Sequence, residues 1–199
     1  YDSTGIQFMD INTVNQLYSL RTYRPQLLEQ AQTLLFMPDL FSYFLTGEKN
    51  VEYTIASTSQ LLCAASRNYD DAILQKLGLK RSLFPQIVMP GTVRGRLREE
   101  LAEELGVGSI EVVAVPSHDT AAAVAAAPIQ KGEKSLYLSS ATWSLLGAEL
   151  PEPLINEKSY RRQLTNEGGT NGKICFLRNI SGLWLLQESR RQWIREGCE

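Results

Sequence analysis

The stretch IEVVAVPSHDTAAAVAAA, residues 110–127, constrains the fold of this 199-residue chain more than any other. Its apolar first part predicts a strand over 110–116 that is buried on both faces, as in a parallel sheet. Its alanine-rich end predicts a helix over 120–127, so the stretch has the strand–turn–helix form of an α/β fold. In open α/β sheets, ligands bind beyond the carboxyl ends of the strands. The only histidine, His118, and its neighbour Asp119 therefore lie where a ligand site is expected.

The segments before this stretch predict mainly helices. Apolar residues recur there at helical spacing, and prolines and glycines mark the starts and stops. We expect these helices within residues 12–21, 24–36, 37–48, 69–80 and 98–106. After residue 134 the pattern predicts strands over 134–140, 142–150 and 173–179, followed by a helix over 181–196. This change of pattern predicts a domain boundary near residues 128–132.

The charge balance and the cysteine and histidine counts argue against several classes of protein. Lysine and arginine number 20 against 22 aspartate and glutamate, which gives no basic surface for nucleic acid. Three cysteines without a C-x-x-C motif, and one histidine, argue against a disulfide scaffold and against a zinc site. No apolar stretch approaches the roughly 18 residues of a membrane span, and no signal-peptide pattern is visible. We therefore expect a cytoplasmic protein that binds neither nucleic acid nor a membrane.

The two ends of the sequence predict a piece of a longer protein. The sequence begins without methionine, and its last predicted helix carries an apolar face formed by Leu183, Leu186, Trp193 and Ile194. Such a face needs a partner that covers it. The sequence ends before it supplies one.

Asp119 is the candidate general base. A helix N-terminus carries partial positive charge and free N–H groups, which favour an ionised carboxylate. An ionised aspartate in a cleft can accept the proton of a substrate hydroxyl, which is the task of the base in phosphoryl transfer. The alternative, which the local pattern favours, is that Asp119 or Thr120 only caps the helix. The two interpretations are compatible, because Thr120 can cap the helix while Asp119 faces a cleft.

A serine-hydrolase relay of Ser117, His118 and Asp119 is not expected. Adjacent side chains on an extended segment point to opposite sides, so three neighbours do not form a relay. The chain also lacks a second histidine that could complete one elsewhere.

Two further stretches carry polar side chains near tight turns. In SLYLSSATWSLLGAEL, residues 135–150, the hydroxyls of the serines and of Thr142 suit a phosphate. The alternative is an ordinary hairpin with a polar turn. In NEGGTNGKICFLRNISGLWLLQES, residues 166–189, the glycines indicate turns first. Asn179 and Gln187 flank the start of a helix there, where both could contact a ligand.

Together these stretches resemble one known family. The motifs HDTAAAVAAAP, LYLSSATWSLLG and NEGGTNGKICFLRNISGLWLLQES, in this order, are similar to those of the FGGY carbohydrate kinases, and most similar to the members that phosphorylate L-rhamnulose. Earlier segments such as TGIQFMDINTVNQLYSLR resemble the later portion of the family's first domain, so the resemblance covers nearly the whole chain. It implies an α/β, actin-like (ribonuclease H-like) two-domain sugar kinase, here incomplete. Residues 1–128 would be the end of the sugar-binding domain, and residues 129–199 the start of the nucleotide-binding domain.

The resemblance also implies a reaction and its residues. The γ-phosphate of ATP would pass to the 1-hydroxyl of L-rhamnulose, with Mg²⁺ and with no metal ligand from these 199 residues. Asp119 would be the catalytic base, and His118, Asp119 and Thr120 would bind the sugar. Thr142, Asn179 and Gln187 would bind ATP. The oligomeric state stays open.

The sequence departs from the family's pattern in two ways. Ala141 stands where the family has a glycine before the hairpin threonine, and glycine permits positive φ and close phosphate approach. We expect weaker ATP binding or a shifted loop from this alanine. The family's D-x-G-[ST] phosphate loop is missing, since DSTG at residues 2–5 is not followed by a suitable pair of strands. The family's glycine-rich adenosine site is missing as well. We therefore expect no turnover from these 199 residues alone.

Three alternatives to a rhamnulose kinase stay open. The first is a kinase for another ketose, such as L-fuculose or xylulose. The second is a sugar-binding or regulatory relic of the kinase fold without activity. Retention of Asp119 argues against the relic, because a binding module needs no base. The third is a structural fragment clipped from a longer protein, which leaves the function of that protein unchanged.

Overall fold

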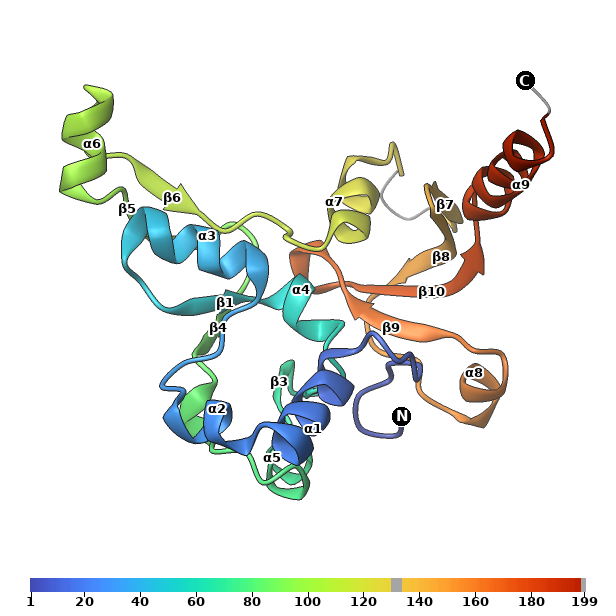
Figure 1. The fold of residues 1–199 in the computed structure, drawn as a ribbon, viewed down its shortest axis with the longest axis horizontal. Helices are drawn as coiled ribbons and strands as arrows, with labels where there is room; N and C mark the ends of the chain where they lie inside the picture. Colours follow the sequence, from blue (N-terminus) through green and yellow to red (C-terminus); the bar gives the residue numbers. More distant parts are fainter. Residues whose placement is uncertain (130–133, 198–199) are drawn as a thin grey trace.

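The computed structural model describes residues 1–129 and 134–197. The chain forms a helix-rich first part and then a four-stranded antiparallel sheet, with helix α7 between them (Figure 1). The mixed α/β class expected from the sequence is confirmed. The predicted boundary near residues 128–132 falls mostly outside the described residues.

Helices account for more residues of the first part than strands do. They are α1 (Thr13–Tyr23), α2 (Pro25–Gln30), α3 (Met37–Thr46), α4 (Tyr53–Ser57), α5 (Asp71–Lys76), the 3-10 helix η1 (Arg81–Leu83), α6 (Glu99–Leu105) and α7 (Asp119–Ala126). Proline starts α2, and Gly47 ends α3 in the left-handed conformation with φ of 80°, as the proline–glycine rule predicts. The expected helix over 24–36 is shorter than predicted, because Ala31 is extended and ends it.

The strands of the first part are short and paired two by two. β1 (Asn50–Glu52) runs parallel to β4 (Gln86–Val88), β2 (Leu62–Cys63) pairs antiparallel with β3 (Asn68–Tyr69), and β5 (Val93–Arg96) pairs antiparallel with β6 (Glu111–Val113). The prediction of a buried parallel strand over 110–116 is therefore wrong. β6 covers only its first residues, its partner is antiparallel, and Val113 and Val115 are exposed.

The four strands after α7 form one sheet. β7 (Tyr137–Ser140), β8 (Trp143–Leu150), β9 (Thr165–Gly168) and β10 (Ile174–Ser181) lie in the order β7-β8-β10-β9. The hairpin of β7 and β8 and the strand β10 agree with the sequence analysis. β9 was not expected, because its TNEG sequence has no apolar residue and is followed by a second glycine. The short helices α8 (Glu157–Arg161) and η2 (Thr170–Gly172) connect these strands, and α9 (Trp184–Arg195) follows β10.

The buried apolar residues form two clusters. The larger lies in the first part and includes Leu17, Val51, Leu61 and Phe84. The smaller joins Val124 of α7 to three residues of the sheet: Tyr137, Cys175 and Leu177. Helix α7 thus packs on the sheet, and this contact positions its N-terminus.

Helix α9 extends from the end of β10 at the edge of the molecule (Figure 1). Leu183, Leu186, Trp193 and Ile194 are all exposed, as the sequence predicted for an apolar face without a partner. Among the described residues, every helix is too short or too polar to cross a membrane.

Candidate active site between helix α7 and the sheet

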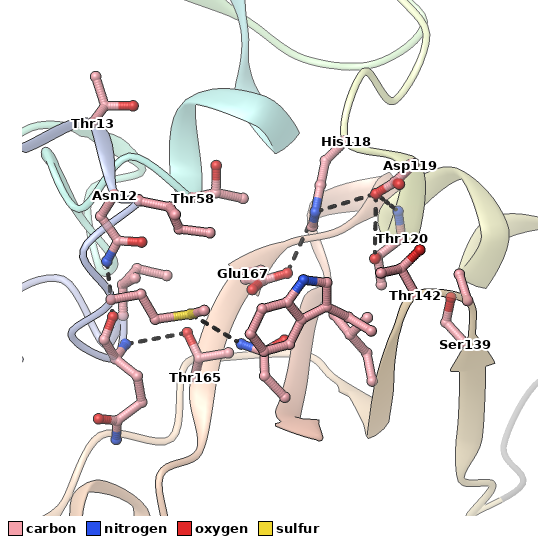
Figure 2. A pocket seen from close by; sticks show the side chains of 18 residues that line it. Asn12, Thr13, Thr58, His118, Asp119, Thr120, Ser139, Thr142, Thr165 and Glu167 are labelled. Atoms are coloured by element: carbon pink, nitrogen blue, oxygen red, sulfur yellow. Dashed lines mark hydrogen bonds and ion pairs between the residues drawn. The ribbon is translucent and has the colours of Figure 1, made fainter. Parts of the chain in front are cut away.

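A pocket of about 380 Å³ lies between the start of α7 and one face of the sheet (Figure 2). Three parts of the chain form its walls. The N-terminal segment and α4 region provide Ile6, Gln7, Met9, Ile11, Asn12, Thr13 and Thr58, the start of α7 provides His118, Asp119 and Thr120, and the sheet provides Ser139, Ala141, Thr142, Trp143, Leu145, Thr165, Glu167 and Asn179.

The sheet contributes a single face to this pocket. Successive side chains of a strand point to opposite faces, and residues paired across strands share a face. Cys175 on β10 is paired with Glu149 on β8 and with Glu167 on β9, so these three side chains share one face. In steps of two residues the same face continues to Thr165 and Asn179, which line the pocket.

Asp119 is the first residue of α7, and its carboxylate borders the pocket. The side chain is 96% exposed, and Oδ1 accepts a hydrogen bond from the backbone N–H of Thr120 at 2.7 Å. The hypothesis that Asp119 or Thr120 is the N-cap is wrong, because His118 occupies that position and makes no side-chain cap bond.

Two buried side chains hold the backbone just before Asp119. Glu52 is fully buried, and its Oε2 accepts the N–H of Ser117 at 3.0 Å. The hydroxyl of Thr54 accepts the N–H of His118 at 3.1 Å and donates to Glu52 at 2.6 Å. Sequence reasoning missed both residues. Glu52 ends β1 and is the N-cap residue of α4, and the available signal was a glutamate between Val51 and Tyr53, where a buried carboxylate needs partners.

His118 lies between two carboxyl groups (Figure 2). Its Nε2 is 3.5 Å from Oδ1 of Asp119, and its Nδ1 is 3.4 Å from Oε2 of Glu167. Burial lowers the pKa of the imidazole, although the Asp119 and Glu52 carboxylates act in the opposite direction. The ring is therefore neutral at pH 7, and one of its nitrogens carries the proton.

Ser117 takes no part in this arrangement. Its hydroxyl donates to the backbone oxygen of Val115 at 3.1 Å, and both nitrogens of His118 face carboxyl groups. The geometry agrees with the rejection of a serine-hydrolase relay.

Glu167 is the third residue that sequence reasoning missed. It lies on β9, is buried, and its carboxyl group lines the pocket opposite Asp119. Burial, and then the negative charge of Asp119, raises the pKa of this carboxyl to about 8. It is therefore protonated at neutral pH. The TNEGG segment gave no signal for it, because its glycines indicate a turn.

The structure brings five of the six predicted site residues to this pocket. His118, Asp119 and Thr120 come from the start of α7, Thr142 from the hairpin turn and Asn179 from β10. Gln187 is exposed on α9 and is not among the lining residues of this pocket in the described part of the chain.

Ala141 does not strain the hairpin turn. Within the described residues, positive φ among non-glycine residues occurs at Gln60, Arg67, Gln163 and Asn171. Ala141 therefore does not have the positive φ that favours glycine, and this reason for expecting a shifted loop does not apply.

The hairpin turn carries several hydroxyl groups. Ser139 and Thr142 line the pocket there, and the hydroxyls of Ser140 and Ser144 lie 3.3 Å apart beside the turn. Hydroxyl groups donate to phosphate oxygens. No group of three or more His, Cys, Asp or Glu residues in the described part is placed to hold a metal ion.

The solved structures that this chain resembles include sugar kinases and a glycerol kinase. The chain superposes on ligand-bound xylulose kinase from Lactobacillus acidophilus with a TM-score of 0.79 at 18% identity, over 96% of this chain and 38% of that one. Plasmodium falciparum glycerol kinase with ADP gives a TM-score of 0.75 at 14% identity, over 94% of this chain and 39% of that one. At these identities the likeness shows the fold alone, which is the actin-like kinase fold.

Curated relatives are closer in sequence. The chain is 45% identical over 193 residues to the rhamnulokinase of Bacteroides thetaiotaomicron and 42% identical to that of Halalkalibacterium halodurans. These matches cover 97% of this chain but only 40% and 41% of the relatives, so the chain spans about two fifths of their length. The model of the FGGY family of carbohydrate kinases, N-terminal domain, matches residues 1–126, which is more than half of the sequence. The chain belongs to the FGGY family of carbohydrate kinases.

Proposed function

We propose that this chain is part of an ATP-dependent kinase that phosphorylates the 1-hydroxyl of L-rhamnulose. One observation carries the proposal. The exposed carboxylate of Asp119 and the hydroxyl-bearing hairpin turn at Thr142 line the same pocket. A general base and a phosphate-binding turn on one cavity are what phosphoryl transfer to an alcohol needs. The choice of L-rhamnulose rests on the relatives that bear the name rhamnulokinase.

In the proposed mechanism the sugar binds against the start of α7. His118 and Thr120 contact it, and Asp119 accepts the proton of the 1-hydroxyl as that oxygen attacks phosphorus. Bound ATP would supply the γ-phosphoryl group and leave as ADP when the bond between its γ-phosphorus and the bridging oxygen breaks, and Mg²⁺ would spread the charge of the phosphate oxygens. Thr142 and Asn179 hold the phosphates at the sheet side of the pocket. Gln187 lies on α9 beyond this pocket, so its assignment to the ATP site is proposed on the resemblance alone.

We also propose the division into residues 1–128, which bind sugar, and 129–199, which begin the nucleotide-binding domain. The family match that ends at residue 126 and the four-stranded sheet that begins after α7 support this division. The pocket lies where the two proposed parts meet. The chain spans only about two fifths of its relatives, so we propose that the 199 residues alone show no turnover in a kinase assay.

The test of Asp119 uses a kinase of full length. Residues 1–199 replace the matching segment of the Bacteroides thetaiotaomicron relative, and phosphorylation of L-rhamnulose, L-fuculose and D-xylulose is measured with ATP. We expect L-rhamnulose to be preferred. In Asp119→Asn we expect kcat to fall about 10²–10⁴-fold, because the base is lost, while the sugar still binds. Calorimetry measures that binding.

Asp71→Asn is the matched control, because Asp71 is also the first residue of a helix and is exposed. Its activity should equal that of the unmodified chimaera. Unchanged turnover in Asp119→Asn removes Asp119 from the role of base. Preference for another ketose overturns the substrate, and sugar binding without turnover in the unmodified chimaera supports the relic.

A further inference from the structure

Two buried polar atoms face each other in the wall of the pocket without a hydrogen bond. They are Oε2 of Glu167 and Nδ1 of His118, 3.4 Å apart. Within the described residues neither atom has a hydrogen-bond partner. Buried polar atoms without partners cost free energy and are rare in folded proteins. A single hydrogen bond between these two atoms satisfies both.

The protonation states decide which group donates. Burial and the charge of Asp119 raise the pKa of Glu167 to about 8, so its carboxyl carries the proton at pH 7. Burial lowers the pKa of His118, so its ring is neutral. The carboxyl is then the donor and Nδ1 the acceptor. A neutral imidazole that accepts at Nδ1 carries its own proton on Nε2.

The position of Asp119 favours the same arrangement. Nε2 of His118 is the atom that lies 3.5 Å from Oδ1 of Asp119. With the proton on Nε2, a partial positive charge faces this carboxylate. With the proton on Nδ1, the lone pair of Nε2 faces it, which is repulsive. An imidazolium ring would satisfy both carboxyl groups, but burial disfavours that charge.

We propose that Glu167 is a positioning residue, whose carboxyl group donates a hydrogen bond to Nδ1 of His118 and thereby directs Nε2–H at Asp119. The backbone at His118 is already held by Glu52 and Thr54 from the first part of the chain. Glu167, which lies on the sheet, also fixes the orientation of the His118 ring. The orientation of the Asp119 carboxylate thus depends on residues from both walls of the pocket. The inference deepens the proposed function and rests on the role given there to Asp119.

The chain offers a direct measurement, because His118 is its only histidine. Long-range ¹H–¹⁵N correlation spectra of the ¹⁵N-labelled 199-residue chain therefore show one imidazole. They distinguish a protonated from an unprotonated ring nitrogen. At pH 7 we expect a neutral ring with the proton on Nε2. A ring protonated on Nδ1, or on both nitrogens, overturns the proposal.

Two variants separate the hydrogen bond from the bulk of the side chain. Glu167→Gln keeps an N–H donor, so the Nε2–H tautomer should persist. Glu167→Met keeps the length but has no donor, so the tautomer should become mixed. Glu149→Met is the matched control, because Glu149 flanks Cys175 from the other side on the same face of the sheet. It should leave the tautomer unchanged. An unchanged tautomer in Glu167→Met overturns the proposal.

Titration of the unmodified chain provides a test that does not depend on the folding of a variant. The groups that face Glu167 are His118 and Asp119 at the start of α7, Tyr137 on β7 and Cys175 on β10, with Glu149 and Lys173 beyond Cys175. Burial raises the pKa of Cys175 to about 12 and that of Tyr137 further, so neither ionises near pH 8.

As the pH rises through about 8, Glu167 loses its proton. The histidine proton should then move towards Nδ1 in the unmodified chain and stay on Nε2 in Glu167→Gln. A tautomer that does not respond in the unmodified chain up to pH 10, well above that pKa, contradicts the proposal.

These results do not depend on catalysis. The tautomer is observed without sugar, nucleotide or turnover. If the kinase assays fail and the spectra agree, the pairing of Glu167 with His118 stands and the activity is wrong. If the assays succeed and the spectra disagree, only the positioning role is lost.

Discussion

Asp39 and Arg94 form an ion pair that water does not reach. Nη2 of Arg94 donates to Oδ1 of Asp39 at 2.8 Å, and the two side chains are 3% and 0% exposed. Arg94 also donates to the backbone oxygen of Asn50 at 2.7 Å, and Asp39 accepts the backbone N–H of Glu52 at 3.0 Å. The pair therefore anchors β1 and, through Glu52, the backbone N–H of Ser117 at the pocket.

We predict that Arg94→Met lowers the free energy of unfolding by about 3–5 kcal/mol, because it leaves the Asp39 carboxylate buried without its partner. The control is Arg96→Met on the same strand, which removes an exposed ion pair with Glu111. That loss should be about 0–1 kcal/mol. Urea denaturation of the three proteins measures both values. Equal losses in the two variants contradict the prediction.

At the scale of elements, the start of α9 docks on the turn between β7 and β8. The N–H of Leu183 donates to the backbone oxygen of Ala141 at 3.0 Å, and that of Trp184 donates to Thr142 at 3.2 Å. Gly182 allows this approach. A Cβ atom at Gly182 would lie 2.6 Å from the Ala141 oxygen and 2.6 Å from the hydroxyl of Ser144. The glycine therefore couples α9 to the proposed phosphate-binding turn.

We predict that Gly182→Ala separates α9 from this turn, because overpacking at such distances costs about 1–3 kcal/mol. Hydrogen exchange of the Leu183 and Trp184 amides should accelerate about 10-fold or more, since about 1.4 kcal/mol corresponds to a factor of ten. Gly108→Ala is the control, because a Cβ there meets nothing within 4 Å. Its exchange pattern should match that of the unmodified chain. If the Leu183 and Trp184 amides stay protected in Gly182→Ala, the turn has moved to accommodate the added Cβ atom, and the prediction is wrong.

At the scale of the whole molecule, the chain exposes more surface than a compact protein of its size. Its accessible surface is 12656 Å² for 22.3 kDa. A compact monomer of that mass exposes about 9,400 Å². The apolar face of α9 accounts for part of this excess. With less surface buried, single buried charges should weigh more in the net free energy of unfolding.

Glu167 should make that free energy depend on pH. Its pKa rises from an ordinary 4.5 to about 8 on folding, so the folded state holds a proton that the unfolded state releases. The free energy of unfolding that the protonated Glu167 contributes is complete below pH 4.5 and is lost as the pH rises through about 8. His118 has a lowered pKa and acts in the opposite direction only below its ordinary 6.5.

Between pH 6.5 and 8, we therefore predict a fall of about 1–2 kcal/mol that Glu167→Gln removes. Urea denaturation across this range measures the slope. Glu149→Gln is the control, and it should keep the slope of the unmodified chain. Equal slopes for Glu167→Gln and the unmodified chain contradict the prediction.

Most of the helices could be predicted from the sequence. Pro25 begins α2, Gly47 ends α3, and the alanine run after Asp119 forms α7, because these signals act within a few residues. The β7–β8 hairpin and β10 could be predicted for the same reason. β9 and the antiparallel partner of β6 could not. β9 has no apolar residue that would indicate a strand. It is extended because its backbone pairs with β10, which the local sequence does not show.

The sequence by itself determined the family motifs, the place of Asp119 at the start of a helix, and five of the residues that line the pocket. Only the tertiary structure placed Glu52 under the backbone of Ser117 and Glu167 beside the ring of His118. Both glutamates are far from His118 and Asp119 in sequence and take their roles from burial and from their partners. Burial raises the pKa of Glu167 and makes its carboxyl a donor. No local pattern shows which carboxylates a fold will bury, because burial depends on the packing of distant segments.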